Sequence, residues 1–388
     1  MMKIGFDAKR AAQNRTGLGN YSRFIVRILS QLHPENEYHL YTPKPHRIPY
    51  LSEIPTLKRL KLHFPPQGFW SHLRSLWRVW GIKKDILHDG INIFHGLSNE
   101  LPLNIGTPES RAARKENACK YVVTVHDLIF LHTPQYYHWI DRKIYNYKFR
   151  HACRCADRVI AVSEYTKQEI MQYYHTPEEK IDVVYQGCAP VFSQDIAPSR
   201  QAEVKKKYAL PDEFVLYVGS IEERKNLMLV AQAIAILATQ KGEEIHVVAV
   251  GRRTPYVDQI QAYLKEKGIS HLFHFQHGVP YDDLPSFYKL ARTFAYPSRI
   301  EGFGIPLLEA ISSGVPAIGC TGSCLEEAGG PDSLYADPDD AESMANIILR
   351  TCRDEDLRQM MIEHGKAYAQ NFSDEQLCQD LMNVYKKL

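Results

Sequence analysis

The chain has 388 residues, of which 44% are hydrophobic and 24% charged, as expected for a globular protein with a large core. This length exceeds what one hydrophobic core usually serves, so we expect two domains. The sequence contains no apolar run of about 18 residues, which excludes a membrane-spanning helix. Its first residues predict a strand rather than a signal peptide. The eight cysteines lack zinc-ribbon or redox spacing, so we expect reduced thiols and no metal site.

The net charge of +2 hides an asymmetry between the two halves of the chain. Residues 1–200 hold 28 Lys and Arg against 18 Asp and Glu, a balance of +10, whereas residues 201–388 hold 19 against 27, a balance of −8. A basic half suggests an anionic partner. The basic residues are dispersed and no nucleic-acid-binding motif surrounds them. We therefore expect no nucleic acid, but an anionic membrane face or a phosphorylated acceptor.

The first half of the chain alternates β-rich runs with helical runs. Lys3–Ala8 predicts a buried strand, and the apolar positions of Tyr21–Leu32 have helical spacing. Further strands are predicted at Tyr38–Thr42, Ile91–Phe94, Tyr121–Val125, Arg158–Val162 and Ile181–Val184. Strands that alternate with helices predict a parallel sheet covered on both faces.

The segment 69–84 (FWSHLRSLWRVWGIKK) is predicted as one amphipathic helix. One face of this helix would carry Phe69, Leu73, Leu76 and Trp80, with Trp70 and Trp77 beside it. Three tryptophans interleaved with arginine and lysine are typical of a helix in a membrane interface. A core helix of the first domain has the same pattern, and the sequence does not choose between the two.

Residues 192–212 interrupt the alternation with a polar stretch that holds two prolines, which we interpret as a linker and an opening helix. The alternation then restarts with a helix at Leu227–Gln240. Strands are predicted at Phe214–Val218, Ile245–Val250, Leu272–Phe275, Thr293–Tyr296 and Pro316–Gly319. Three helical stretches close the chain, the last from about Ser373. Two open parallel sheets predict a ligand crevice at the carboxyl ends of their strands, in a cleft between the domains.

A glycine turn links the first strand to its helix. Gly17 and Gly19 let a backbone approach a phosphate or a sugar at the helix N-terminus. The dinucleotide fingerprint needs a third glycine where Ser22 stands, which argues against NAD. The turn is therefore either a ligand-facing loop or only a tight turn.

His126 follows the predicted strand Tyr121–Val125, at the edge of a parallel sheet where ligands bind. Its ring either contacts a sugar or is a packed and hydrogen-bonded core histidine. The neighbouring Asp127 either orients His126 or caps the following turn.

The turn Gly219–Asn226 (GSIEERKN) follows the first strand of the second half. Gly219 and Ser220 open it, and Arg224 and Lys225 stand just before a helix. Cations there oppose the helix dipole, so they are poor choices for stability alone. The pattern favours a phosphate site, and a solvated charged turn is the alternative.

The strongest motif is Glu301–Glu309 (EGFGIPLLE). Pro306 suits the first turn of a helix, and Gly302 and Gly304 allow an unusual backbone close to a ligand. Glu301 would lie in the loop and Glu309 about one turn inside the helix. Backbone amides at a helix start suit a diphosphate, and carboxylates suit ribose hydroxyls.

Asp337-Pro338-Asp339 matches the Asp-x-Asp pattern of metal-dependent sugar transfer. Helix capping explains these residues fully, so we expect no metal there.

The chain resembles the retaining glycosyltransferases of family 4, whose fold is called GT-B. Glu301–Glu309 matches the family's Glu-x7-Glu motif, and Arg224-Lys225-Asn226 and Ala156–Ser163 resemble two further family segments. The resemblance runs over almost the whole chain. A weaker similarity points to mannosyltransferases that build bacterial surface polysaccharides.

This resemblance implies an α/β protein of two Rossmann-like domains whose parallel sheets face a central cleft. The acceptor-side domain would span residues 1–192, and a linker residues 193–212. The nucleotide-sugar-binding domain would span residues 213–371. The last helix, residues 372–388, would pack back on the first domain.

The resemblance also implies roles for single residues. Glu309 would hold the donor ribose, and Glu301 would contact the transferred sugar. The amides of Phe303, Gly304 and Ile305, next to Gly302, would meet the diphosphate and the sugar.

Lys225 would neutralise the leaving diphosphate in such an enzyme. The family often has arginine after Gly219, where this chain has Ser220, so Arg224 would supply that cation. His126 would touch the sugar near its reacting carbon, and the Gly17–Gly19 loop would close over the site.

By the same resemblance, the enzyme is retaining, needs neither metal nor cofactor, and uses a nucleotide sugar, with GDP-mannose the leading guess. Its acceptor would be a glycan or a lipid-linked glycan of a surface polysaccharide. We expect a cytoplasmic protein, at the inner membrane face if the basic half contacts lipid. A sugar-nucleotide epimerase, a phosphorylase and a non-catalytic nucleotide-binding protein of the same architecture stay open as alternatives.

Overall fold

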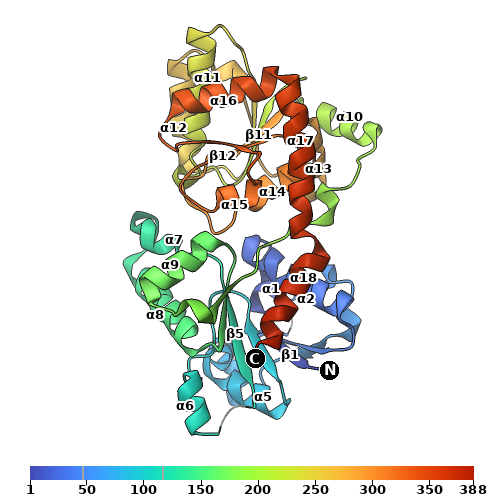
Figure 1. Ribbon diagram of the computed structural model, residues 1–388, viewed down its shortest axis with the longest axis vertical. Coiled ribbons are helices and arrows are strands. Elements are labelled where there is room, and N and C mark those ends of the chain that lie inside the picture. Colours follow the sequence, from blue (N-terminus) through green and yellow to red (C-terminus); the bar gives the residue numbers. More distant parts are fainter. Residues whose placement is uncertain (46–47, 116–117) are drawn as a thin grey trace. The chain divides into compact units, whose positions relative to one another are not determined.

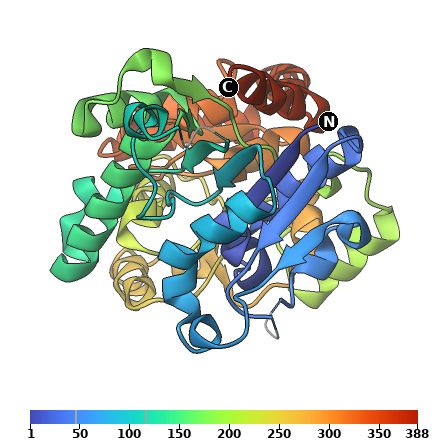
Figure 2. The ribbon, with the colours of Figure 1, turned by 90° about the horizontal axis from the view of Figure 1, so that it is seen from below.

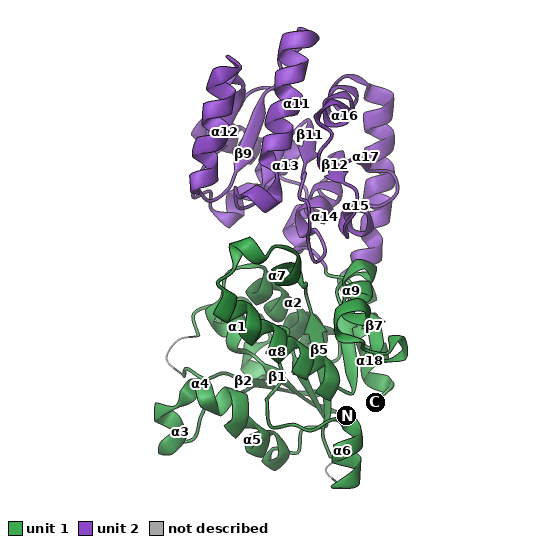
Figure 3. Ribbon diagram, turned by 90° about the vertical axis from the view of Figure 1, so that its left-hand side faces the viewer, with its two compact units in different colours: residues 1–186, 374–388 green, residues 187–373 purple. Residues whose placement is uncertain are grey.

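The computed structural model describes residues 1–45, 48–115 and 118–388. It divides into two compact units (Figure 3): unit 1 contains Met1–Gln186 and Asp374–Leu388, and unit 2 contains Gly187–Ser373. Each unit is built around one parallel sheet, as the alternation of strands and helices predicts. No helix in these described ranges is long and apolar enough to cross a membrane.

Unit 1 contains a sheet of seven parallel strands in the order β3-β2-β1-β4-β5-β6-β7. Its strands are β1 (Lys3–Asp7), β2 (Glu37–Tyr41), β3 (Lys61–His63), β4 (Ile93–Gly96), β5 (Lys120–Val125), β6 (Arg158–Ala161) and β7 (Ile181–Val183). The chain runs from the inner strand β1 to β3 at one edge and then returns to β4 on the other side of β1. The strand order therefore reverses between β1 and β4, and open parallel sheets bind ligands outside the carboxyl ends of such strands.

Helices cover both faces of this sheet. They are α1 (Lys9–Gln13), α2 (Gly17–Leu32), α5 (Ile82–His88), α6 (Pro108–Ala113), α7 (Ile129–His132), α8 (Trp139–Cys155), α9 (Glu164–Tyr174) and α18 (Asp374–Lys386). In Figure 1, α8 and α9 lie on one side of β5 and α2 and α18 on the other. α18 belongs to unit 1: Arg27 on α2 forms two bonds to Asp374, at 2.6 and 2.9 Å, and the Tyr385 hydroxyl lies 2.7 Å from His95 Nδ1. Both chain termini therefore lie on the same side of unit 1 (Figure 2).

The single helix predicted over 69–84 is wrong. The structure instead has short helices α3 (Phe69–His72) and α4 (Arg74–Leu76), then a π-helical turn at Trp77–Gly81 that leads into α5. The turn directs Trp77 into the core, where its ring is fully buried and its Nε1 donates to Asp85 at 2.6 Å. Gly81 allows this packing, because a Cβ there would lie 2.8 Å from the Trp77 ring.

Some residues of this segment fit a core helix, and others stay exposed as in a helix at a membrane interface. Trp77 is a core residue, and Arg78 is turned inward to the carboxylates of Asp7 and Glu100. Phe69 and Trp80 stay 66% and 47% exposed. Leu73 is likewise 41% exposed, so three of the four residues on the predicted apolar face stay at the surface.

Unit 2 repeats the architecture with six parallel strands in the order β10-β9-β8-β11-β12-β13. Its strands are β8 (Val215–Val218), β9 (Val247–Val250), β10 (Phe273–Gln276), β11 (Thr293–Ala295), β12 (Ala317–Cys320) and β13 (Leu334–Ala336). Its helices are α10 (Pro198–Lys207), α11 (Leu227–Gln240), α12 (Pro255–Glu266), α13 (Leu284–Leu290), α14 (Ile305–Ser312), α15 (Leu325–Gly329), α16 (Ala341–Arg353) and α17 (Glu355–Ala369). The strand order reverses between β8 and β11.

Unit 2 begins at Gly187, before the predicted linker 193–212. Half of that segment is the helix α10, which is attached to the unit through the buried Asp283. Lys207 Nζ and the Tyr208 hydroxyl donate to Asp283 at 2.8 and 2.6 Å, and Arg200 contacts the same carboxylate. The polar composition of this segment suggested a linker, but three of its polar side chains bind the buried carboxylate of Asp283.

Candidate active site

The carboxyl ends of β8 and β11 carry a buried cluster of ionised side chains. Glu301 lies in the loop after β11, and Arg224 and Lys225 end the short 3-10 turn Glu223–Lys225 after β8. Arg224 Nη1 and Lys225 Nζ lie 2.9 and 2.8 Å from Glu301 Oε1. Because β8 and β11 are neighbours where the strand order reverses, the cluster stands where open parallel sheets bind ligands.

Two hydroxyl groups complete the surroundings of Glu301. Ser298 Oγ and the Tyr296 hydroxyl donate to Glu301 Oε1 at 2.7 and 3.1 Å. The Tyr296 ring also lies under Lys225, whose Nζ is 4.9 Å from the ring centroid. Burial alone would raise the pKa of Glu301, but the charges of Lys225 and Arg224 outweigh burial and lower that pKa to about 2. Glu301 is therefore ionised at neutral pH and holds both cations in place.

The turn before these cations is closely packed. Gly219 N donates to Val250 O at 2.9 Å, and a Cβ on Gly251 would lie 1.9 Å from Gly219 O. Ser220 Oγ donates to Glu222 Oε1 at 2.8 Å, and Arg224 Nη2 lies 3.4 Å from the same oxygen. Ser220 thus adds no cation, and Arg224 is the guanidinium that faces Glu301.

The glycines after Glu301 start α14 in an unusual backbone conformation. Gly304 caps the helix with a φ of 114°, and a Cβ there would lie 2.8 Å from Leu325 Cδ2. Pro306 stands in the first turn, as predicted. Phe303 is 3% exposed and packs on Phe372, with ring centroids 5.5 Å apart. The motif therefore contributes backbone, including Gly302 and Ile305, to the helix start, while the Phe303 side chain stabilises the core.

Glu309 lies inside α14, about one turn from its start. Its Oε2 accepts a hydrogen bond of 2.8 Å from the Tyr288 hydroxyl on α13. Burial raises the pKa of Glu309 to about 7. Glu301 and Glu309 thus have carboxyl pKa values shifted in opposite directions, which is typical of two carboxylates with different tasks.

In unit 1, His126 follows β5 and is 5% exposed. Its Nε2 lies 2.9 Å from Leu97 O, and its Nδ1 lies 3.2 Å from Gln186 Nε2. The edge of its ring meets Tyr21, with centroids 4.5 Å apart. Burial lowers the pKa of His126 to about 4, so the ring is neutral at pH 7. Both ring nitrogens are engaged, and the backbone N–H donates to Asn99 Oδ1 at 2.7 Å, so only a carbon edge of the ring carries no hydrogen bond.

The neighbouring Asp127 has a local role. Its Oδ1 accepts a hydrogen bond of 3.1 Å from Ile129 N at the start of α7. Of the two alternatives for Asp127, the structure favours the turn cap.

The two glycines before α2 differ in what surrounds them. A Cβ on Gly19 would lie 1.8 Å from Asn14 O, so glycine is required there for packing. At Gly17 no described atom lies within 4 Å of the Cβ position. Gly19 therefore belongs to the tight turn, whereas only Gly17 leaves space for a ligand.

The aspartates of the Asp-x-Asp sequence in unit 2 form hydrogen bonds and an ion pair with nearby residues. Asp337 Oδ1 accepts from Asp339 N at 2.8 Å, and Asp339 forms an ion pair of 2.6 Å with Arg299. The next residue, Asp340, caps α16 through Ser343 N. These contacts agree with the capping interpretation.

Comparisons with known proteins identify the family. The models for Glycosyltransferase Family 4 and Glycosyl transferases group 1 match residues 21–190 and 200–368. The O-antigen chain mannosyltransferase B of Escherichia coli is 30% identical over 410 aligned positions, which cover 100% of both chains. The chain belongs to this family of glycosyltransferases.

Solved structures agree on the fold of this glycosyltransferase. Anabaena Alr3699/HepE, solved in complex with UDP and glucose, has a TM-score of 0.74 at 18% identity, with 100% of both chains covered. A glycosyltransferase from Rickettsia africae has a TM-score of 0.74 at 16% identity and covers 100% and 98% of the two chains. The fold is therefore GT-B, as the sequence motifs suggested.

The structure also adds residues that the sequence did not indicate. Tyr296 and Ser298 of the glycosyltransferase hold Glu301, Tyr288 holds Glu309, and Gln186 holds His126. Tyr296 directly follows β11, at the carboxyl edge where ligand residues gather, and that position was a signal in the sequence. Tyr288 and Gln186 gave no such signal, because their partners are distant in the chain.

Proposed function

We propose that this glycosyltransferase transfers mannose from GDP-mannose, with retention of anomeric configuration, to a growing bacterial surface glycan. The observation that carries the choice of sugar is the full-length match to an O-antigen chain mannosyltransferase. The serotype-specific mannosyltransferase WbdA of Escherichia coli supports the same sugar. It is 28% identical over 264 residues, which cover 66% of this chain and 32% of WbdA.

In the proposed reaction the bond between the anomeric carbon and the diphosphate oxygen breaks, an acceptor hydroxyl oxygen bonds to that carbon, and the hydroxyl proton is lost to the leaving diphosphate. Negative charge grows on the leaving diphosphate. Lys225, Arg224 and the first amides of α14 would stabilise this charge, so that no metal ion is needed. The support for this role is that the two cations are held in advance, 2.8 and 2.9 Å from Glu301.

We assign Glu301 to the transferred sugar and to the orientation of Lys225. Glu309, which the Tyr288 hydroxyl holds at 2.8 Å, would accept hydrogen bonds from the ribose hydroxyls. The Gly17 backbone would approach the donor, and His126 would meet the sugar through a carbon edge of its ring.

A donor panel tests the proposal. The enzyme is mixed with GDP-mannose, GDP-fucose, UDP-glucose or a dTDP-sugar, in EDTA, with a mannose-terminated lipid-linked oligosaccharide. Mass spectrometry should show one added hexose from GDP-mannose alone, and the anomeric proton signal should show retention. Transfer from another donor would refute the sugar, and arrest by EDTA would refute metal independence.

The same assay separates the alternatives. An epimerase would convert the donor without acceptor, and a phosphorylase would require inorganic phosphate. A thermal shift with GDP, in EDTA, tests donor binding independently of the acceptor. A folded enzyme that shifts with UDP but not GDP would contradict the proposed donor.

We further propose that unit 1 contacts an anionic membrane through one face of α8. Trp139, Ile140, Ile144 and Tyr147 on this helix are 59%, 44%, 44% and 63% exposed. The helix carries five Lys and Arg against the single acid Asp141. Lys143 Nζ lies 4.9 Å from the Trp139 ring. Exposed apolar side chains among cations suit a lipid surface with anionic headgroups.

Sedimentation with vesicles of phosphatidylglycerol and phosphatidylcholine tests this contact. A Trp139→Glu, Ile144→Glu variant should lose binding about tenfold, while a matched Phe69→Glu, Leu73→Glu variant should bind like the wild type. The reverse pattern would return the contact to residues 69–84. Binding that both variants keep would refute both surfaces.

A further inference from the structure

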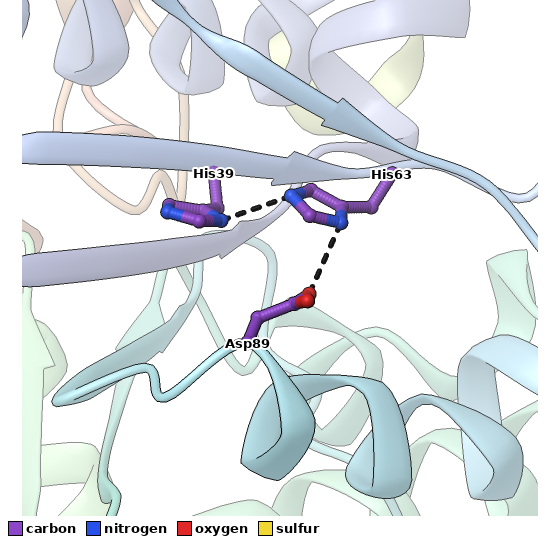
Figure 4. A group of neighbouring side chains, drawn as sticks. All are labelled: His39, His63 and Asp89. Atoms are coloured by element: carbon purple, nitrogen blue, oxygen red, sulfur yellow. Dashed lines mark hydrogen bonds and ion pairs between the residues drawn. The ribbon is translucent and has the colours of Figure 1, made fainter.

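A cluster in unit 1 plays no part in the proposed transfer. His39 on β2, His63 on β3 and Asp89 after α5 point toward one another (Figure 4). The facing nitrogens, Nδ1 of His39 and Nε2 of His63, lie 2.9 Å apart, and the two rings stack with centroids 4.9 Å apart. On its other side His63 Nδ1 lies 3.0 Å from Asp89 Oδ2.

Carboxylates face the outer nitrogen of both rings. Asp89 is held by the Tyr41 hydroxyl at 2.7 Å, so its oxygen is fixed against His63. Glu37 is held by Lys61 Nζ at 2.5 Å, and its Oε2 lies 3.5 Å from His39 Nε2. That nitrogen is buried and forms no hydrogen bond to the described residues.

With one N–H on each ring, His39 Nδ1 can donate to His63 Nε2 and His63 Nδ1 to Asp89, which leaves His39 Nε2 without a proton beside Glu37. A neutral imidazole carries a single N–H, and a carboxylate only accepts hydrogen bonds. When both outer nitrogens instead direct their N–H toward Asp89 and Glu37, the facing nitrogens present two lone pairs to each other. A cation between His39 and His63 removes this repulsion.

We propose that the facing nitrogens of His39 and His63 bind one divalent transition-metal ion, with Asp89 and Glu37 as outer partners. Imidazole nitrogen is a preferred ligand of zinc, copper and nickel. Zinc–nitrogen bonds of about 2.0–2.1 Å in a tetrahedron place two nitrogens about 3.3 Å apart, so the rings need to separate by only about 0.4 Å. Histidine ligands that are oriented by carboxylates recur in metal sites. Water molecules would complete the coordination.

A metal ion at this site would stabilise the edge of the sheet and would take no part in sugar transfer. β3 is an edge strand of three residues, and His63 is its last residue. A metal ion shared with His39 would tie β3 to β2. EDTA should therefore lower the melting temperature of the enzyme without slowing transfer.

A second pair of facing histidines, in unit 2, serves as a control for this proposal. His246 Nδ1 and His274 Nε2 face each other at 3.1 Å. Among the described residues, however, no carboxylate forms an ion pair with either ring, so nothing orients the outer nitrogens. This pair should bind metal much more weakly than the pair in unit 1.

The test uses the full chain without a histidine tag, stripped of metal. Zinc in about tenfold excess should raise the melting temperature by about 2–4 °C, and calorimetry should show one ion per chain. His63→Gln should abolish the shift, and the matched His274→Gln should keep it. No uptake by the wild type would overturn the proposal, in favour of a proton shared between the rings. Equal uptake by both variants would place the metal on others of the 17 histidines.

A second variant covers the case in which His63→Gln does not fold. Asp89→Asn keeps both ligands and should weaken zinc binding about 10–100-fold. Cobalt(II) should give visible absorption bands in the wild type that are weaker in Asp89→Asn. Unchanged zinc affinity in this variant would overturn the proposed role of Asp89 and the site as drawn.

Discussion

The two units have the same strand topology, but the charges at the point where the strand order reverses are inverted. In unit 1 a cation lies between two acids: Arg78 contacts Asp7, the last residue of β1, and Glu100 after β4. In unit 2 an acid lies between two cations: Glu301 contacts Arg224 and Lys225. The same position in the fold therefore holds a central positive charge in one unit and a central negative charge in the other.

The inversion suggests different tasks for the two clusters. Charges that are buried need partners, and both clusters meet this need. In unit 1 Lys148 Nζ adds a second cation, 3.1 Å from Glu100, which balances two acids with two cations. In unit 2, within the described residues, Lys225 forms its ion pair with Glu301 and also contacts the Tyr296 hydroxyl, whereas Arg224 pairs with both Glu301 and Glu222. An arriving diphosphate can therefore take Lys225 as its counterion at little cost.

The largest loss of stability should follow from a change in the unit 1 cluster of Arg78, Asp7 and Glu100. Arg78→Met leaves Asp7 and Glu100 without their shared cation, and losing one partner of a buried pair costs about 3–5 kcal/mol of unfolding free energy. Urea unfolding of unit 1 measures this loss. Arg78 and Lys148 hold the pKa of Glu100 at about 2 against the effect of burial. The contribution of Glu100 to the unfolding free energy is therefore complete above its unfolded pKa of about 4.5, and it is lost as the pH falls toward 2.

The control for this prediction is Lys148→Met, which removes the more exposed cation and should cost less. An Arg78→Met protein as stable as the wild type would show that the cluster is not structural.

Removal of Lys225 should affect turnover rather than folding. Lys225→Ala keeps Glu301 bonded to Arg224, Ser298 and Tyr296, so the fold should persist. Loss of one preorganised charge that stabilises a leaving group costs about 10²–10³-fold in kcat. Steady-state release of GDP measures it, with Lys241→Ala on the surface of unit 2 as the control. A normal kcat in folded Lys225→Ala would remove this residue from the chemistry.

The pKa of Glu309 should appear in donor binding. Burial raises that pKa to about 7, and only the ionised form accepts two ribose hydroxyl bonds. Affinity for the donor should therefore be complete above pH 7 and fall by up to about tenfold per pH unit below it. Titration calorimetry with GDP between pH 5.5 and 8.5 measures the slope; these limits lie about one and a half pH units to each side of the pKa.

The matched variant Glu309→Gln should bind GDP weakly and without this slope. His126 contributes nothing in this range, since burial keeps its pKa at about 4. Affinity that rises as pH falls would contradict the assignment of Glu309 to the ribose.

The smallest effect on stability should be at the turn before α2. Gly17→Ala meets no described atom within 4 Å and replaces glycine by a better helix former, so stability should change by no more than about 1 kcal/mol. If the Gly17 backbone approaches the donor, kcat/KM should still fall. Thermal melts and kinetics on the same sample test both statements. Unchanged kcat/KM would leave the turn with a structural role only.

Particular elements show how far local patterns reach. The helix α11 has the bounds that the apolar spacing predicted, Leu227–Gln240, because 11 of its 14 residues are apolar. β3 was missed, since three residues at a sheet edge carry no alternation. The segment 69–84 was predicted as one helix because its spacing is helical, but the core needs Trp77 and a π-helical turn supplies it.

For the site, the sequence by itself determined the chemical groups, and the tertiary structure decided their partners. The segment Glu301–Glu309 is a local motif that holds the glycines, Pro306 and both carboxylates. Arg224 and Lys225 lie together in one turn, so residue order alone reveals both segments. The pairing of these two segments depends on β8 and β11 lying side by side, with 75 residues between Lys225 and Glu301. The meeting of His39 with His63 likewise depends on strand register. Such contacts are long-range, and only packing of the whole chain creates them.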